Sequence, residues 1–318
     1  MILITGCAGF IGYHLSKKLL QENYKIIGFD NLNNYYDTKL KNLRLSELKK
    51  FKNFKFVKID LCNFDKLLKI TKKLKILKIV HFAAQPGVRY SFDNPRKTLI
   101  NNLLSFLNII EIARIKKIKE FIYASSSSVY GNVKKFPFSE GDLSIKPISI
   151  YGASKLSNEI IADTYAKNYK LDCFGLRFFT VYGPYGRPDM AYYKFALDNL
   201  SNQKIKLYNK AKMFRDFTYI DDVVTAIFKV INSKKNISHN ILNIGKGKPD
   251  RLIDLVNSLQ NNLNNKFNIS YIDFMPKGDI KKTYSSNIKI KKFLNWSPKT
   301  TLNEGIHKFI DWFKNFHK

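Results

Sequence analysis

A glycine-rich turn near the start of the chain constrains the fold more than any other stretch. Residues 2–5 form a short, mainly apolar run that predicts a buried strand. Gly6, Gly9 and Gly12 follow at three-residue spacing, and a leucine pattern typical of a helix begins directly after them. A tight glycine turn lets backbone N–H groups and a helix N-terminus approach a pyrophosphate. The turn, with Phe10 and Ile11 between its last two glycines, therefore predicts a dinucleotide site.

The acid that would complete such a site ends the next apolar run. Residues 25–29 predict a second strand, and Asp30 follows about 20 residues after the turn, where a carboxylate binds the hydroxyls of an adenosine ribose. Because a carboxylate repels a 2′-phosphate, Asp30 favours NAD, with Asn31 and Asn33 as neighbouring candidates. A glycine turn without a ligand is the structural alternative, but the order strand, turn, helix, strand and acid favours the cofactor.

Strands and helices continue to alternate through the first half of the chain. Further strands are expected at residues 54–59, 76–82, 121–124 and 173–178, and the longest helices at 96–115 and 149–169. This order predicts an α/β fold with a Rossmann-type doubly wound parallel sheet, whose ligands lie beyond the carboxyl ends of the strands. We expect an NAD-binding domain at 1–178 and a smaller mixed α/β substrate lobe at 179–318, with some of its segments returning to the first domain. Asp221 or Asp222 is expected to cap a helix in that lobe.

A serine run and a Tyr–Lys pair suggest the chemistry. Tyr151 and Lys155 lie four residues apart, and on a helix they share one face. A nearby cation stabilises a phenolate, which lets the tyrosine act as a base near neutral pH. A hydroxyl from Ser125–Ser128 would bridge that phenolate to a substrate hydroxyl. The spacing alone is weak support, since it recurs at Tyr13/Lys17, Tyr35/Lys39, Tyr130/Lys134 and Tyr208/Lys212.

Composition excludes some functions. The net charge of +30 suits a nucleic-acid or membrane partner, yet Arg occurs at only eight positions and Lys is spread evenly along all 318 residues. We interpret the charge as compositional drift and expect no nucleic-acid partner. We also expect no apolar run long enough to span a membrane, no leader segment and a cytoplasmic location. The three Cys and five His have no metal-ligand spacing, so no metal is expected.

With these residues in place, the chain resembles the nucleotide-sugar epimerase/dehydratase group of extended short-chain dehydrogenases/reductases. The general motifs are the glycine turn, Asp30, Asp60-Leu61, Ala83-Ala84-Gln85 and Tyr151…Lys155. Residues 30–37, 85–90, 125–128 and 178–190 are most similar to the UDP-glucuronate 4-epimerases within that group. The likeness covers nearly the whole chain.

The resemblance implies NAD in the first domain and a UDP-sugar between the domains. Tyr151 would be the base, Lys155 would hold the nicotinamide ribose and lower the pKa of Tyr151, and Ser126 or Ser128 would bridge to the C4 hydroxyl. The remaining implied cofactor contacts are Asp60, Leu61, Ala83, Ala84, Gln85, Asn102, Ser125 and Phe178. The implied substrate contacts are Arg89, Ser127, Thr180, Arg187, Arg215 and Asp279.

The implied reaction is oxidation at C4 of a UDP-sugar and return of the hydride to the other face, with UDP-glucuronate as the first substrate and UDP-glucose or UDP-N-acetylglucosamine as alternatives. In the 4,6-dehydratases of this group an acidic pair follows the catalytic hydroxyl, whereas Ser127 and Ser128 stand there in this chain. The alternative from a different functional class is a non-catalytic protein of the same fold that binds nucleic acid or regulates transcription.

Two further expectations follow from the resemblance. The long helices at 96–115 and 149–169 would pair with a second copy in a homodimer, and Leu103, Leu107 and Ile110 could serve that interface or the core. Arg187 and Thr180, with Arg89 as a third candidate, would hold the sugar carboxylate. The structural alternatives are that Arg187 only anchors its own turn, and that Arg215 pairs with Asp216 or Asp221.

Overall fold

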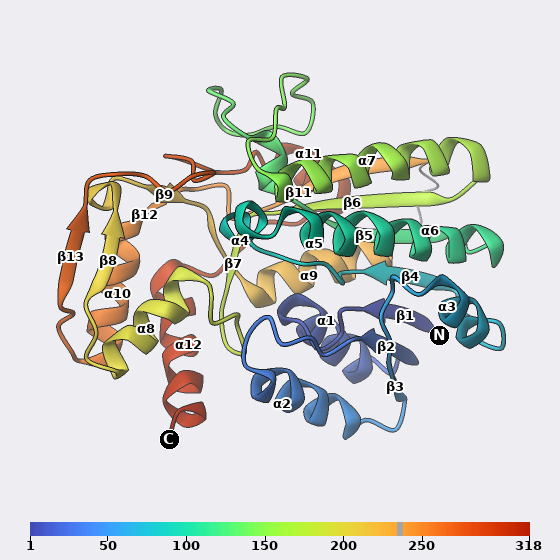
Figure 1. Ribbon diagram of the computed structural model, residues 1–318, viewed down its shortest axis with the longest axis horizontal. Coiled ribbons are helices and arrows are strands. Elements are labelled where there is room, and N and C mark those ends of the chain that lie inside the picture. The colour runs from blue at the N-terminus through green and yellow to red at the C-terminus, as the bar shows by residue number, and fades with distance from the viewer. Residues whose placement is uncertain (234–237) are drawn as a thin grey trace. The chain divides into compact units, whose positions relative to one another are not determined.

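A seven-stranded sheet forms the centre of the larger of two units into which the chain divides (Figure 1). The computed structural model describes residues 1–233 and 238–318. The larger unit combines residues 1–133, 143–178 and 224–242, and the smaller unit combines 134–142, 179–223 and 243–318.

The sheet confirms the expected doubly wound architecture. Its strands are β1 (Ile2–Thr5), β2 (Ile26–Asp30), β3 (Phe54–Lys58), β4 (Lys78–His81), β5 (Glu120–Ser126), β6 (Asp172–Phe178) and β11 (His239–Ile244). They lie in the order β11-β6-β5-β4-β1-β2-β3, and every pairing from β6 to β3 is parallel. The chain reverses its direction of winding between β1 and β4, which is where such sheets bind ligands.

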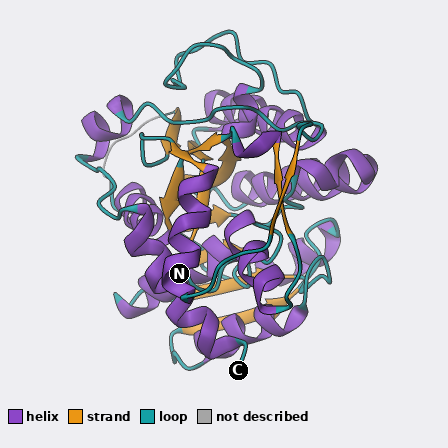
Figure 2. Cartoon of the chain, turned by 90° about the vertical axis from the view of Figure 1, so that its left-hand side faces the viewer, coloured by secondary structure: helices purple, strands orange, loops and turns teal. Residues whose placement is uncertain are grey.

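Helices cover both faces of this sheet (Figure 2). The elements of the unit are α1 (Phe10–Gln21), α2 (Thr38–Lys49), α3 (Phe64–Thr71), α4 (Val88–Asp93), α5 (Pro95–Leu99), α6 (Ser105–Ile115), the 3₁₀ turn η2 (Ser127–Tyr130), α7 (Ile150–Tyr169) and most of α9 (Ile220–Ile231). Between the sheet and α3, α6 and α7 lies a fully buried apolar core that includes Phe106, Ile109 and Phe121. Apolar burial of this kind is the main force that holds the layers together.

The expected helix at 96–115 differs in two ways from the prediction. A π-helical turn, η1 (Ile100–Leu104), separates α5 from α6. Contrary to our expectation, Pro95–Ile115 is also the one helix within the described residues that is long and apolar enough to cross a membrane. Half of its apolar window is buried inside the protein. Its apolar side that faces the sheet explains this composition without a membrane.

The smaller unit is built from short strand pairs and helices. Its strands are β7 (Thr180–Tyr182), β8 (Ile205–Tyr208), β9 (Phe214–Arg215), β10 (Phe217–Tyr219), β12 (Asp250–Arg251) and β13 (Ile269–Ile272). Its helices are α8 (Ala191–Leu200), the 3₁₀ turn η3 (Asn209–Ala211), α10 (Leu252–Leu263), α11 (Ile288–Leu294) and α12 (Leu302–Phe316). Tyr192 of α8 meets Phe309 of α12 edge to face and Tyr193 packs against it at a tilt, with ring centroids 4.8 and 5.5 Å apart.

The expectation that Asp221 or Asp222 caps a helix is wrong, because these residues are the second and third of the helix. Helix α9 begins at Ile220, so both carboxylates lie within its first turn. There they face the positive end of the helix dipole. Asp222 also accepts hydrogen bonds outside its own helix, because its Oδ2 receives the N–H of Thr300 at 3.0 Å.

Candidate active site

The glycine turn closes tightly at the carboxyl end of β1. A Cβ on Gly12 would lie 2.1 Å from the carbonyl oxygen of Gly6, and a Cβ on Gly6, whose φ is +71°, would lie 2.7 Å from the Ala83 nitrogen. Gly9 precedes α1, whose first turn has no acidic residue. The first N–H groups of a helix have no partner within it. The turn therefore presents N–H donors of Phe10, Ile11 and Gly12 in a cradle that only glycine leaves open.

Asp30 lies against this turn at the end of β2. Its Oδ2 accepts the N–H of Ala8 at 3.1 Å and its Oδ1 accepts the N–H of Leu32 at 2.8 Å. Asn31 and Asn33 continue the same pattern, each accepting the N–H two residues further on at 3.1 and 3.3 Å. These side-chain turns hold the loop that carries the predicted ribose contacts.

Two basic residues that the sequence interpretation missed support that loop. Lys41 donates to the carbonyl oxygen and the side chain of Asn33 at 2.6 and 2.7 Å. Arg44, which is fully buried, donates from Nη1 to the carbonyl oxygen of Ala8 at 2.9 Å and to the Tyr36 hydroxyl at 2.7 Å. Both residues lie on α2, where the sequence pattern is typical of exposed charges on a helix surface, and no sequence motif identified them.

The other predicted cofactor residues lie at the ends of β3 and β4. Asp60 is exposed after β3, while Leu61 is buried and its carbonyl oxygen accepts the Asn108 amide at 2.8 Å. After β4, Ala83 and Ala84 precede Gln85, whose N–H donates to Asn102 Oδ1 at 2.7 Å. Asn102 lies in the π-helical turn and is buried.

The Asn102 amide joins three segments. Its Nδ2 donates to the Gln85 carbonyl oxygen at 3.2 Å and to the Ser154 hydroxyl at 3.0 Å. The Ser154 hydroxyl in turn donates to the carbonyl oxygen of Tyr151 at 2.8 Å. Asn102 thus links the chain after β4 to the first turn of α7. In this role its side chain supports the predicted cofactor residues after β4.

The serine run curls from the end of β5 into η2. Ser126 Oγ accepts the N–H of Ser128 at 3.1 Å and contacts the Ser128 hydroxyl at 3.2 Å. Ser127 and Ser128 are partly exposed, whereas Ser125 is buried and its hydroxyl donates to Glu159 at 2.5 Å. The side chain of Ser125 therefore points away from the predicted site, and a cofactor contact there would come from its backbone.

Tyr151 and Lys155 lie on the first two turns of α7, capped by Ser149, whose hydroxyl accepts the N–H of Gly152 at 3.0 Å. The Lys155 ammonium lies 5.9 Å from the Tyr151 ring centroid and donates to the carbonyl oxygen of Ala124 at 3.0 Å. Burial lowers the pKa of Lys155 to about 8, because a desolvated ammonium is less stable than one in water. The predicted base and its cation thus lie beside the strand that leads into the serine run.

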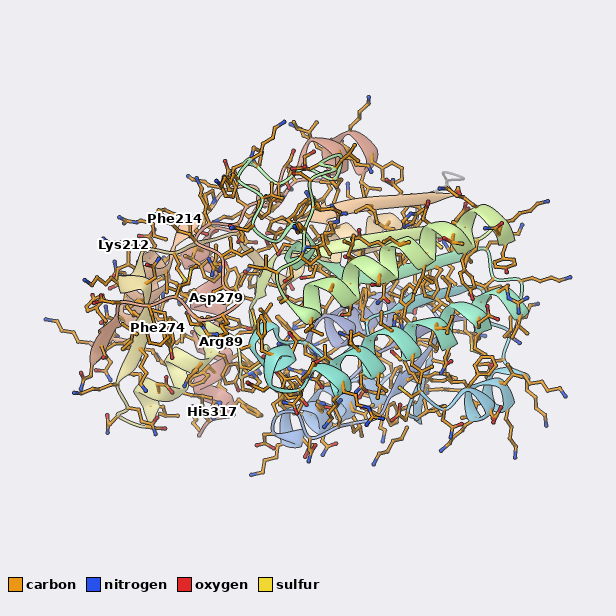
Figure 3. All side chains as sticks on the ribbon, turned by 45° about the horizontal axis from the view of Figure 1, so that its top comes forward. Arg89, Lys212, Phe214, Phe274, Asp279 and His317 are labelled. Atoms are coloured by element: carbon orange, nitrogen blue, oxygen red, sulfur yellow. The ribbon has the colours of Figure 1, made fainter. Side chains whose placement is uncertain are left out.

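Phe178 and Arg89 complete the predicted residues of the larger unit. Phe178 ends β6, is buried and meets Phe82 edge to face at 5.8 Å. Arg89 is exposed in the first turn of α4, which starts after Gly87 (Figure 3). A Cβ on Gly87 would lie 2.7 Å from the Tyr35 hydroxyl, so the loop after β2 packs closely on this turn.

In the smaller unit, Thr180 and Arg187 lie near each other in sequence but make different contacts. Thr180 starts β7 and its N–H donates to the carbonyl oxygen of Asp216 at 3.0 Å. Arg187 binds Asp189 in its own turn through two hydrogen bonds, from Nε at 3.0 Å and from Nη2 at 2.5 Å. This pair matches the structural alternative for Arg187, so a substrate carboxylate would have to displace Asp189 or share the Arg187 guanidinium with it.

Arg215 and Asp279 are the remaining predicted substrate contacts. Arg215 lies on β9 and donates from Nη1 to the carbonyl oxygen of Phe214 at 2.9 Å. The buried Asp216 carboxylate accepts five hydrogen bonds from other groups: Thr218, the N–H groups of Lys246 and Gly247, and the N–H and hydroxyl of Ser285. Asp279 closes the turn that follows β13, where its N–H donates to Pro276 (Figure 3).

No group of three or more possible metal ligands occurs in the described parts of the chain. The larger unit carries the predicted nucleotide cradle, the predicted ribose acid Asp30, serine hydroxyls and a tyrosine with a buried cation beside it. These groups come from the ends of β1, β2, β4 and β5 and the start of α7.

Comparison with known proteins places this arrangement among sugar-nucleotide enzymes. A family model described as GDP-mannose 4,6 dehydratase matches residues 3–309. Protein CapI of Staphylococcus aureus is 43% identical and covers 100% of this chain and 99% of its own length. UDP-glucuronate 4-epimerase of Thermodesulfobacterium geofontis is 39% identical over 98% of this chain and 95% of its own. The crystal structure of UDP-glucuronic acid 4-epimerase from Bacillus cereus, in complex with UDP-glucuronic acid and NAD, superposes with a TM-score of 0.92, 33% identity and 99% coverage of both chains.

Proposed function

We propose that this chain, which belongs to the nucleotide-sugar epimerase/dehydratase family of extended short-chain dehydrogenases/reductases, is an NAD-dependent 4-epimerase that interconverts UDP-glucuronate and UDP-galacturonate. The observation that carries the proposal is the position of Tyr151 and Lys155 at the start of α7, beside the end of β5 and its serine run. The same fold supports many reactions, so these site residues, rather than the architecture, indicate the function.

The residues of the larger unit fit NAD. The glycine cradle would hold the pyrophosphate at the start of α1, since a Cβ at position 12 would fill it. Asp30, ordered by Ala8 and Leu32, would accept the adenosine ribose hydroxyls. Bound NAD supplies a reversible hydride acceptor for C4 of the sugar. Asp60, Leu61, Ala83, Ala84, Gln85 and Phe178 would line the remainder of the cofactor site.

The chain's own residues would remove and return the proton of the C4 hydroxyl. Tyr151 removes it from the C4 hydroxyl, and Ser126 or Ser128 hydrogen-bonds the same hydroxyl and orients it. The Lys155 cation, buried where water cannot screen it, stabilises the phenolate form of Tyr151. The proton returns from Tyr151 after the 4-keto sugar has presented its other face.

The serine run argues against dehydration, the activity that the matching family model is named for. Elimination of water across C5 and C6 needs groups that move protons at those carbons. Residues 125–131 contain no carboxylate: Ser127 and Ser128 occupy the positions where related dehydratases are expected to have an acidic pair. The site therefore suits simple oxidation and return.

For the substrate we propose the following contacts. Arg215 would pair with the diphosphate, because a planar guanidinium can bind two phosphate oxygens. Thr180 and Arg187, with Arg89 as a third candidate, would hold the sugar carboxylate, while Ser127 and Asp279 would make further contacts. Restraining the carboxylate matters, because oxidation at C4 creates a β-keto acid that can lose CO2.

The decisive experiment is incubation of the purified protein with UDP-glucuronate, UDP-glucose and UDP-N-acetylglucosamine, with the C4 epimer followed by NMR. We expect UDP-galacturonate from UDP-glucuronate. Turnover of only a neutral sugar would move the assignment to the UDP-glucose or UDP-N-acetylglucosamine epimerases. No turnover of any sugar, with nucleic acid co-purifying with the protein, would favour the non-catalytic nucleic-acid-binding alternative.

We also propose a homodimer that forms through α5, η1, α6 and α7. Leu99, Ile100, Leu104 and Leu107 are each 36–41% exposed on the first helical stretch, and Ile160 of α7 is 61% exposed. Apolar residues that are contiguous on a surface commonly mark an interface. Of the residues that we expected to serve either interface or core, Ile110 is fully buried and belongs to the core, whereas Leu107 faces outward.

Location and pathway complete the proposal. We expect a cytoplasmic enzyme without a membrane or nucleic-acid partner. A role in capsule or lipopolysaccharide biosynthesis is supported by the likeness to the relative named Protein CapI.

A further inference from the structure

A buried ion pair joins β5 and α7, which carry proposed catalytic groups, to the neighbouring strand β6. Ser125 of β5 and Arg177 of β6 are register partners, and both donate to Glu159 of α7. The Ser125 hydroxyl lies 2.5 Å from Glu159 Oε1, and the Arg177 guanidinium binds both carboxylate oxygens, with Nε 2.9 Å from Oε1 and Nη2 2.7 Å from Oε2. One carboxylate therefore fixes the separation of two strands and a helix.

The pair is almost completely removed from water. The side chains of Arg177 and Glu159 are 3% and 5% exposed, and the guanidinium lies over the Tyr130 ring, 4.8 Å from its centroid. Burial alone would lower the pKa of Arg177, but the bonds to Glu159 outweigh it and raise that pKa, so the arginine remains charged. A buried ion pair of this kind seldom stabilises a protein more than apolar side chains of the same size would. Stability alone is thus a poor reason for its presence.

Its position suggests a better reason. Tyr151, Lys155 and Glu159 follow one another at four-residue spacing along one face of α7. Lys155 holds the carbonyl oxygen of Ala124, and Glu159 holds the hydroxyl of the next residue, Ser125. The residues that come directly after these two are Ser126 to Ser128. The helix that carries the base is in this way tied to the strand that leads into the serine run.

We propose that Glu159 and Arg177 are positioning residues that hold the Ser126–Ser128 segment at its working distance from Tyr151. They touch neither substrate nor cofactor and act through Ser125 and through the register of β5 with β6. The inference rests on the proposed epimerase function for its kinetic consequence, but its structural consequence, an ordered serine segment, is independent of that function.

The test compares the wild type with Glu159→Gln/Arg177→Leu, which removes both charges together so that neither is left unpaired in the core. Two quantities are measured on NAD-loaded protein: the single-turnover rate of epimerisation per bound NAD, and amide hydrogen exchange in residues 124–131. We expect the rate to fall roughly 10- to 100-fold, the usual consequence of slight misplacement of reacting groups. Exchange in that segment should rise while NAD content and the KM for the UDP-sugar change little.

Glu120→Gln is the matched control. Glu120 lies at the other end of β5 and forms an ion pair with Lys78 at 2.7 Å, in which the two side chains are 22% and 27% exposed, so its loss removes a less buried ion pair from the same strand. This variant should keep the wild-type rate per bound NAD and the wild-type exchange of residues 124–131. An equal loss of rate in Glu120→Gln would overturn the proposal in favour of general destabilisation of the sheet.

Ser125→Ala decides the matter if the double variant does not fold. It removes one hydroxyl and leaves the ion pair intact, and faster exchange in residues 125–131 with a slower single turnover would support the proposed positioning role. A wild-type rate and wild-type exchange in either folded variant would overturn it. If the wild-type protein turns over no UDP-sugar, the proposed function fails, and the hydrogen-exchange comparison alone decides whether Glu159 and Arg177 order the serine segment.

Discussion

A Cβ on Gly152 would lie 2.6 Å from the carbonyl oxygen of Ser128. This is closer than a Cβ and a carbonyl oxygen can approach, so the first turn of α7 reaches the serine run because Gly152 has no side chain. The residue before this glycine is Tyr151. The close approach of a helix and the 3₁₀ turn η2 thus brings together the proposed base and the proposed bridging hydroxyls, which lie in separate segments of the sequence.

Replacing Tyr151 by Phe should lower kcat by at least about 100-fold, the usual contribution of a positioned base. NAD and UDP should stay bound, because the ring remains and the cradle is untouched. Turnover by NMR and NAD content after denaturation check both expectations.

Tyr169→Phe is the control for this change, since Tyr169 lies at the far end of the same helix and is 51% exposed. It should turn over like the wild type. A folded Tyr151→Phe protein with near-normal kcat would remove Tyr151 from the mechanism.

Gly12→Ala should abolish retention of NAD during purification. The added methyl would lie 2.1 Å from the Gly6 carbonyl oxygen, so the turn must open, at a cost of about 1–3 kcal/mol of folding free energy. Gly141→Ala is the matched substitution, because no atom lies within 4 Å of a Cβ built there. Absorbance of released NAD and urea unfolding measure the two effects. Full NAD content in Gly12→Ala would contradict the assignment of the cradle.

The buried Lys155 should make stability depend on pH in a predictable direction. Its pKa is about 8 in the folded protein, against 10.5 for an unperturbed lysine, so between these values the unfolded chain binds more protons. Stability from this group is therefore lowest below pH 8 and rises as the pH increases toward 10.5.

Lys155→Met should remove this rise, which is on the order of 3 kcal/mol for a shift of this size. Urea unfolding of the NAD-free wild type and variant is measured at a pH of about 7.5 and again near the pKa of an unperturbed lysine. The gain in unfolding free energy of the variant is subtracted from that of the wild type, so that the contributions of the other lysines cancel. A wild type that gains no stability relative to Lys155→Met over this interval would show that the Lys155 pKa is not lowered.

Arg187→Ala should lower kcat/KM for UDP-glucuronate by roughly 10- to 100-fold, the value of a charge-assisted hydrogen-bonding fork, and leave NAD content unchanged. A UDP-pentose side product is expected where the keto acid is no longer restrained. Arg251→Ala is the matched control, since Arg251 pairs with Asp254 in its own turn much as Arg187 pairs with Asp189. Efficient epimerisation of UDP-galactose by the wild type, with UDP-glucuronate untouched, would contradict the carboxylate assignment.

Light scattering at micromolar concentration should give the mass of a dimer. Leu104→Glu/Leu107→Glu places charges on the exposed apolar side of η1 and α6 and should shift the protein toward the monomer. Ile288→Glu, at an even more exposed apolar residue on α11, should have no such effect. A monomeric wild type would exclude this interface.

Local sequence patterns determined the strands of the sheet, the glycine turn and the helix that carries Tyr151 and Lys155. The apolar runs at β1 and β2, the spacing of Gly6, Gly9 and Gly12, and the position of Asp30 each depend on neighbours within one turn or strand. Backbone preferences and burial periodicity act over such short distances, which is why these features could be predicted residue by residue.

Only the tertiary structure decided which side chains meet. Glu159 finds Ser125 and Arg177 across 34 and 18 residues because the register of β5 with β6 sets their positions. The same holds for Arg44, whose charge is buried against the carbonyl oxygen of Ala8. The π-helical turn that places Asn102 against Gln85 likewise has no local signature in the sequence. Periodicity can predict that a residue faces the interior, but the partner it finds there depends on how distant elements pack.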